Sequence, residues 1–320
     1  MAAPQIYKST DGNAPVMRGE RRALIDVLRA CLVDGYGDKT PAGWTLEFIN
    51  ATFDKAVFRN SPVTGTGFYL RVDGLSPANT YTQALKAYEI MTDIDNGSGM
   101  FGSPVTSQDI LTSNAAGTTS RPWVLVADDR AFYLFIWHSI TAVPTNANYD
   151  VTGLFFGDII PRLDSDAFAA ALCASNSSQY YIWGSHTAAG SGNLVPSVST
   201  APFFACHFPR RENAATGGVT VPLIHGGGPY PNNSPGAATN VIAYSASDPL
   251  VLSMPYFSNG AAYTMRGWFP GLYFPCHPLP FEQWATAVKD GRSFFSIRNS
   301  IYVAPITPTN ILISLDDWRA

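Results

Sequence analysis

The chain has 320 residues, of which 46% are hydrophobic and only 14% are charged, and its formal net charge is −4. The charged fraction is well below the roughly 25% typical of soluble domains, which indicates either a surface covered by partners or a large core that dilutes the charge. The sequence lacks the basic stripe that nucleic-acid binding needs, an apolar run long enough to span a membrane, and the pattern of a secretory signal peptide.

The first predicted element is an amphipathic helix. Its apolar residues recur at the spacing of one helix face, and Gly35 follows where a left-handed C-terminal cap belongs. The residues of that face are Leu24, Val27, Leu28, Cys31 and Leu32. Residues 1–16 have too little apolar pattern to pack, so we predict an N-terminal arm over 1–16 and a single large β-rich domain over 17–320.

After the helix, short runs of aromatic and β-branched residues alternate with turn residues, which predicts strands. In chain order the predicted strands are Trp44–Ile49, Ala56–Arg59, Phe68–Val72, Leu85–Met91, Leu154–Ile160, Tyr180–Trp183, Leu250–Met254, Tyr263–Phe269, Ser293–Val303 and Asn310–Leu315. Pro122–Ile136 predicts a hairpin with a polar tip at Asp128-Asp129-Arg130, and its apolar arms indicate a central position covered on both faces. Ser165–Cys173 predicts a short helix, and Trp318 predicts a docked C-terminal segment.

The fold class that these elements predict is α+β, mainly β. Closely spaced turn signals favour antiparallel sheets over βαβ units, in a sandwich- or barrel-like arrangement. The N-terminal amphipathic helix and long Gly/Pro-rich loops at 186–200 and 226–240 complete this prediction. A subdivision of the domain is left open near residue 145.

The cysteines give no disulfide framework. They are Cys31, Cys173, Cys206 and Cys276. Their wide spacing favours buried thiols, and whether any of them forms a disulfide is left open. His207 and His277 directly follow two of the cysteines, but neighbouring residues on a strand point to opposite faces and the CxxC spacing is absent. We therefore predict no metal ligand and no cofactor.

Two glycine-rich segments resemble functional loops only in part. Asp93–Gly99 begins like a calcium-binding loop with Glu89 upstream, but Pro104 stands where the loop needs glutamate, so we interpret it as a turn. His225–Gly228 is similar to an esterase oxyanion loop, but the chain has no GxSxG motif, so we interpret it as a surface loop.

Two further groups admit alternative interpretations. Asp158, Asp164 and Asp166 are either glycosidase carboxylates or, more simply, residues at a helix start capped by Ser165 or Asp166. The aromatic runs Tyr180–Trp183 and Trp268–Phe274 are either sugar-stacking platforms or, as we favour, core strands or subunit interfaces. We predict no catalytic residue and no enzymatic activity.

The order of motifs along the chain resembles a family of virion structural proteins, associated with the tail or baseplate of tailed bacteriophages and prophages. The matching stretches are Asn13–Val16, Ala30–Gly37, Pro41–Thr45, Gly67–Asp73, Tyr88–Asp93, Arg121–Val124, Phe132–Phe135 and, more weakly, Phe156–Ile159 and Arg266–Tyr273. The resemblance implies a virion component without known enzymatic activity, assembled in the host bacterial cytoplasm.

The resemblance also implies homo-oligomers and contacts with neighbouring virion proteins, arranged on cyclic symmetry. The arm of residues 1–16 and the loop His225–Asn240 are the predicted interfaces. The alternatives left open are a head decoration protein, a neck or connector protein, a tail-tip module that binds bacterial surface glycans through Trp183 and Trp268, and a hydrolase that uses Asp158.

Overall fold

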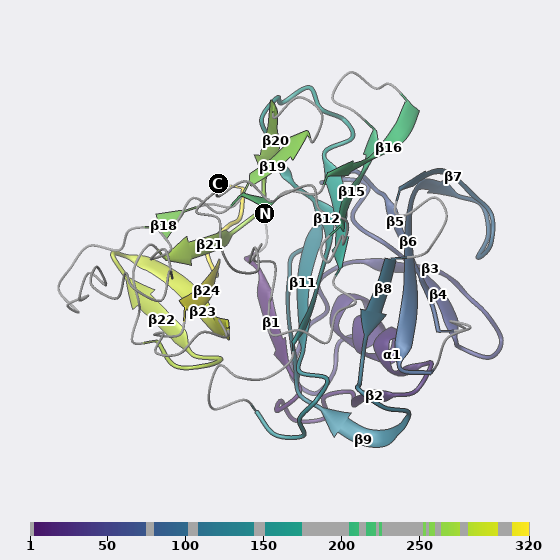
Figure 1. Ribbon diagram of the computed structural model, residues 1–320, viewed down its shortest axis with the longest axis vertical. Coiled ribbons are helices and arrows are strands. Elements are labelled where there is room, and N and C mark those ends of the chain that lie inside the picture. The colour runs from purple at the N-terminus through teal and green to yellow at the C-terminus, as the bar shows by residue number, and fades with distance from the viewer. Residues whose placement is uncertain are drawn as a thin grey trace, which may run out of the picture.

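The computed structural model describes residues 3–74, 80–101, 108–143, 151–174, 205–210, 216–221, 224–225, 252–253, 256–259, 264–275, 281–299 and 309–319. The described strands form stacked antiparallel sheets, as predicted, and these sheets do not close into a barrel (Figure 1). Among the described residues, no helix is both long and apolar enough to cross a bilayer.

A seven-stranded sheet lies at the centre of the molecule (Figure 1). In spatial order its strands are β1 (Gln5–Lys8), β10 (Trp123–Ala127), β11 (Ala131–Ile136), β12 (Thr152–Asp158), β14 (Ala170–Ala174), β15 (Ala205–Arg210) and β16 (Thr216–Val221). Every residue of β10, β11, β12 and β14 is buried. The predicted central hairpin, covered on both faces, is therefore confirmed.

The central strands supply two separate cores because successive side chains point to opposite faces. On β10, Leu125 belongs to a core shared with the N-terminal layer, whereas Val124 and Val126 belong to a core shared with the C-terminal layer. On β12, Phe156 and Phe155 divide in the same way. The near-continuous apolar runs of these strands follow from this two-sided burial.

The N-terminal layer covers one face of the central sheet. It comprises β2 (Met17–Gly19), which pairs with β9 (Gly117–Arg121), the helix α1 (Ala23–Arg29) with the π-helical turn η1 (Ala30–Asp34), and a six-stranded sheet. The strands of that sheet are β3 (Thr45–Ile49), β4 (Lys55–Arg59), β5 (Tyr69–Asp73), β6 (Thr82–Met91), β7 (Gly97–Phe101) and β8 (Gln108–Leu111), with β8 beside β6.

The predicted helix face is buried, but the helix ends differently from the expectation. All five predicted apolar residues, from Leu24 to Leu32, are fully buried. The α-helix stops at Arg29 and η1 continues it, since the Gly35 amide donates to the Ala30 carbonyl at 2.9 Å across five residues. Gly35 has φ +80° and ψ 171°, so it is not the left-handed cap that we predicted.

The C-terminal layer covers the other face. It holds a five-stranded sheet in the order β18 (Leu252–Ser253), β21 (Leu272–Pro275), β24 (Thr309–Ser314), β23 (Arg292–Asn299) and β22 (Thr286–Lys289). A four-stranded sheet comprises β13 (Ile160–Pro161), β20 (Thr264–Trp268), β19 (Tyr256–Asn259) and β17 (Ile224–His225). Trp318 is docked as predicted, because its ring packs edge-on against Tyr133 and its Nε1 donates to the Ser314 carbonyl at 2.8 Å.

The structure overturns one predicted helix and shows where part of residues 1–16 packs. Ser165–Cys173 is not a helix: residues from Ala170 onward form β14, because this apolar run lies between β12 and β15, where only a strand completes the hydrogen bonding. Within residues 1–16, β1 pairs with β10 and Tyr7 is fully buried, so this part of the predicted arm packs on the central sheet.

Several predicted features lie outside the described residues. They are the strand Tyr180–Trp183, the loops 186–200 and 226–240, the position near 145, and Cys276 with His277. The division into an arm and one large domain therefore stays a prediction.

The cysteines differ among themselves. Cys31 is a buried free thiol, as interpreted, whereas Cys173 is disulfide-bonded, which corrects its interpretation as a thiol. The Cα register partner of Cys173 on β15 is Cys206.

Candidate functional site

Asp158 lies at the centre of a polar group that connects distant segments. We call the group Asn60, Thr66, Asp128, Asp158 and Arg319 the Asp158 cluster. Asp158 ends β12, and Asp128 lies in the β10–β11 turn. Asn60 and Thr66 lie in the β4–β5 connection, and Arg319 follows the last strand. The cluster therefore joins the N-terminal layer, the central sheet and the C-terminal segment.

The carboxylate of Asp158 is held by three donors from the β4–β5 connection. The Thr66 hydroxyl and Asn60 Nδ2 donate to Oδ1 at 2.6 and 2.9 Å, and the Thr66 amide donates to Oδ2 at 3.0 Å. Asn60 Nδ2 also contacts the Arg130 carbonyl at 2.9 Å. The oxygens of Asp158 are thus committed to one neighbouring segment.

Asp128 has a different set of partners. Its Oδ1 accepts the backbone amides of Arg130 and Ala131 at 2.9 and 2.7 Å, which fixes the β10–β11 turn. Its Oδ2 accepts Nη1 of Arg319, whose Nη2 donates to the Asp158 carbonyl at 3.1 Å. One guanidinium therefore connects the turn to the end of β12.

Burial dominates the electrostatics of both carboxyl groups. It raises the pKa of Asp158 above its ordinary value, although the Thr66 hydroxyl, the Arg319 charge and the Asn60 amide favour the ionised form. Burial also raises the pKa of Asp128, with Arg319 and the turn amides opposing that effect.

The geometry of the Asp158 cluster suits fixation better than proton transfer. A general acid or base must reach a substrate atom, whereas each Asp158 oxygen already accepts a hydrogen bond and the residue is buried. The Asp158 cluster therefore has a structural role, in which its hydrogen bonds hold distant segments together.

The three aspartates of the predicted acidic group do not come together. Asp164 is exposed, and Asp166 lies in a second cluster with Glu89, Arg210 and Arg266, which we call the paired-arginine cluster. Asp166 accepts the Phe168 amide at 3.0 Å in a turn, so its predicted role as a helix cap is wrong.

The paired-arginine cluster connects β6, β15 and β20. Arg266 Nε donates to Asp166 Oδ2 at 3.0 Å, and Arg210 Nε donates to Glu89 Oε1 at 2.6 Å. Arg266 Nη1 also donates to the Arg210 carbonyl, which links the two ion pairs. The guanidinium carbons lie over aromatic rings, Arg266 on Phe208 at 4.5 Å and Arg210 on Phe168 at 4.4 Å.

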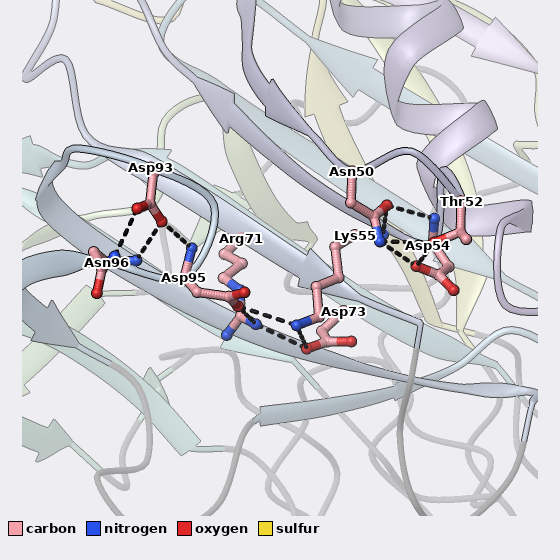
Figure 2. Close-up of polar contacts among 9 residues, drawn as sticks. All are labelled: Asn50, Thr52, Asp54, Lys55, Arg71, Asp73, Asp93, Asp95 and Asn96. Atoms are coloured by element: carbon pink, nitrogen blue, oxygen red, sulfur yellow. Dashed lines mark hydrogen bonds and ion pairs between the residues drawn. The ribbon is translucent and has the colours of Figure 1, made fainter.

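A third polar group lies on the six-stranded sheet and the turns beside it (Figure 2). Asp95, in the β6–β7 turn, accepts Arg71 Nη2 at 2.6 Å and Lys55 Nζ at 3.0 Å. Asp73 accepts Arg71 Nη2 at 2.9 Å. Asn50 closes the neighbouring β3–β4 turn by accepting the amides of residues 54 and 55.

The first part of the calcium-like segment is a turn, as we interpreted it, whereas Gly97 to Gly99 belong to β7. Asp93 Oδ1 accepts the amides of Asp95 and Asn96 at 2.7 and 3.0 Å, and these bonds, the first one foremost, lower its pKa. Figure 2 shows the Asp93 and Asp95 carboxylates on different partners, and Glu89 pairs with Arg210 elsewhere. The part of the chain that is described holds no group of three metal-ligating side chains.

The remaining residues that the sequence singled out lie in the core or outside the described residues. Phe269, in the aromatic run Trp268–Phe274, is fully buried against Phe155 and Tyr133, which places it in the core. His207 is buried on β15, and its Nε2 has no hydrogen-bond partner within the described ranges. The side chain of His225 and the loop that follows it lie outside the described residues.

Sequence reasoning missed the polar residues that complete these clusters. They are Asn60, Thr66, Asp128, Arg210, Arg266 and Arg319. The only sequence signal was their position next to predicted strands, which is common to most polar residues. Their roles depend on contacts between segments as far as 191 positions apart.

Comparison with known proteins adds no family assignment: neither a protein-family model nor a curated protein sequence matches the chain.

Proposed function

We propose that this chain is a structural component of a tailed-phage virion, associated with the tail or baseplate, that acts through contacts between subunits. The observation that carries the proposal is the Asp158 cluster. Its two buried carboxylates bind donors from two distant segments, the β4–β5 connection and Arg319, and hold the layers in one arrangement. A part that must present fixed surfaces to neighbours needs such rigidity.

The paired-arginine cluster supports the same function. It uses the buried ion pair Arg266–Asp166, the partly exposed ion pair Arg210–Glu89 and stacking of both guanidinium groups on aromatic rings to connect the edge of the central sheet to strands from both outer layers. The order of sequence motifs, with its resemblance to virion proteins, supplies the biological setting. The partners in this proposal are further copies of the chain and neighbouring virion proteins.

The first experiment locates the protein in particles of the phage that encodes it. Purified particles are analysed by mass spectrometry, and intact particles are labelled with gold-conjugated antibody for electron microscopy. Label at the tail end supports the proposal. Label over the head or neck supports the decoration or connector alternative, and absence of the protein from particles contradicts a structural role.

A second experiment separates assembly from the glycan-binding and hydrolase alternatives. The purified chain is applied to a glycan array and assayed for sugar release, with Trp268→Ala and Asp158→Asn as variants. The structural proposal expects neither binding nor release. Glycan binding that Trp268→Ala abolishes, without loss of folding, favours a tail-tip recognition module instead.

A further inference from the structure

Arg121 is a buried cation that pairs with no carboxylate in the described part of the chain. It ends β9, and only 7% of its surface is exposed. Its Nε donates to Ser113 Oγ at 2.9 Å, its Nη2 to Asn114 Oδ1 at 2.6 Å, and its Nη1 to the Ile140 carbonyl at 3.3 Å. All three acceptors are neutral, and these bonds use three of the five N–H groups of a guanidinium.

Other arginines in buried clusters of this chain are neutralised. Arg266 pairs with Asp166, Arg319 with Asp128, and Arg210 with Glu89. Arg121 forms no ion pair with any acidic residue that the structure describes. A buried charge is costly unless it is paired. Burial accordingly lowers the pKa of Arg121.

His138 is an orphaned polar side chain in the same place. It is fully buried, and neither Nδ1 nor Nε2 has a hydrogen-bond partner among the residues that the structure describes. Asn114 connects it to Arg121, since the Asn114 amide donates to the His138 carbonyl at 2.9 Å while the Asn114 side chain binds the guanidinium. Burial, together with the charge of Arg121, lowers the pKa of His138 to about 4, so its ring is neutral at pH 7.

We propose that Arg121 and His138 form an anion-binding site that takes a carboxylate. The described residues leave two N–H groups of Arg121 without an acceptor, which matches the two oxygens of a carboxylate, and a neutral imidazole adds one N–H donor. The bound anion neutralises the buried guanidinium and supplies the partner that the imidazole lacks. Ser113 and Asn114 hold the guanidinium in orientation.

The carboxylate has two possible sources, a free small acid or an acidic side chain of a second copy of the chain. Arg121 retains some exposure and His138 none, so the anion meets the guanidinium first. The site is independent of the proposed virion role, because it depends only on unsatisfied charge and hydrogen bonding within one chain.

The test titrates the full chain with acetate at pH 7, against chloride at equal ionic strength, and follows thermal unfolding. We expect a saturable rise of the unfolding temperature in acetate, since a ligand that binds only the folded state stabilises it. Arg121→Gln should weaken acetate binding about tenfold or more, because a charge-assisted hydrogen bond is lost. Arg29→Gln, which removes an exposed guanidinium paired with Asp34, should leave binding unchanged.

A measurement on the wild-type chain covers the case in which Arg121→Gln does not fold. The ring of His138 is followed by NMR, its signal assigned as the one lost in His138→Gln or, if that variant does not fold, by triple-resonance spectra of the wild-type chain. Acetate should raise its pKa from about 4, because a nearby negative charge favours the protonated ring.

Sedimentation distinguishes the two sources. If a second copy fills the site, the wild-type chain and Arg29→Gln form oligomers that acetate dissociates, whereas Arg121→Gln is a monomer. If the ligand is a free acid, acetate stabilises a monomer. A monomer whose unfolding temperature and His138 titration are the same in acetate and chloride overturns the proposal.

Discussion

Arg319, the next-to-last residue of the chain, forms an ion pair with Asp128, which lies 191 positions earlier in the β10–β11 turn. The two side chains are 9% and 7% exposed, so water screens the pair only weakly. The same guanidinium donates to the Asp158 carbonyl. The C-terminal segment therefore closes the Asp158 cluster and is part of the folded structure.

Removal of Arg319 should destabilise the protein strongly. Arg319→Gln leaves the Asp128 carboxylate buried without its cation, which we expect to lower the free energy of unfolding by about 3 kcal/mol. Chemical denaturation at pH 7 measures this value. Arg29→Gln, which breaks an exposed pair with Asp34, should cost less than about 1 kcal/mol.

The double variant Asp128→Asn/Arg319→Gln tests whether the unpaired Asp128 carboxylate causes the loss of stability. It removes both charges, so it should be more stable than Arg319→Gln alone by about 1–2 kcal/mol. Equal stability of the single and double variants would show that the ion pair does not carry the effect.

Asp158→Asn should weaken the same cluster through hydrogen bonding. The asparagine has one acceptor oxygen, so either the Thr66 amide or the donors to Oδ1 lose their partner. We expect a loss of about 2 kcal/mol in the free energy of unfolding. Asp164→Asn alters an exposed carboxylate of the same acidic group and should change stability by less than about 0.5 kcal/mol. Similar losses in the two variants would contradict the assigned role of Asp158.

The sequence predicted the elements whose signals are local. The hairpin Pro122–Ile136, the buried face of α1 and most strands follow from hydrophobic patterning within each segment. Ser165–Cys173 misled this reasoning because an alanine-rich apolar run suits a buried strand and a helix alike. Gln5–Lys8 was missed because four residues carry too little pattern, although β10 gives them a pairing edge.

The sequence did not predict which residues come together in the polar clusters. Asp158 was identified as a polar residue at a strand end, but its partners Asn60 and Thr66 are more than 90 positions away in the chain. Asp158 and Asp166 were grouped by proximity in sequence, yet their carboxylates pair with different segments. Side-chain pairing over such distances is determined by how the sheets stack, which no local pattern records.

Acidification should destabilise the protein through its buried histidines. Burial lowers the pKa of both His138 and His207 from 6.5 to about 4, so between these values the unfolded chain binds protons that the folded chain does not. Stability therefore falls as pH drops from 6.5 toward 4, by about 2 kcal/mol per histidine at pH 5. The raised pKa values of Asp128 and Asp158 act in the opposite direction.

The histidine contribution is isolated by comparing variants. Denaturation of the wild type, His138→Phe and His207→Phe is measured at pH 7 and pH 5 in chloride buffer. Each variant should lose about 2 kcal/mol less than the wild type between the two values. An unchanged pH dependence would mean that these rings are already protonated or solvated in the folded protein.

The cysteines should differ in reactivity. Burial raises the pKa of the Cys31 thiol, so an alkylating reagent should modify Cys31 only after the chain unfolds. Cys173 is disulfide-bonded, so its alkylation should require both denaturant and reductant. Peptide mass spectrometry reports the two sites in one digest. Labelling of Cys173 without reductant would contradict the disulfide.

Gly271 should be intolerant of a side chain because of its neighbour Trp318. Its φ is +67°, and a Cβ at this position would overlap the indole ring. Gly271→Ala therefore combines backbone strain with displacement of a ring that packs against Tyr133, and should lower the free energy of unfolding by about 3 kcal/mol.

Gly12→Ala is the matched control, since a Cβ there meets no atom within 4 Å and it should change stability by less than about 0.5 kcal/mol. Near-UV circular dichroism, which reports the environment of the tryptophans, should change in Gly271→Ala alone. An unaltered spectrum with unaltered stability would show that Trp318 does not depend on this glycine for its place in the core.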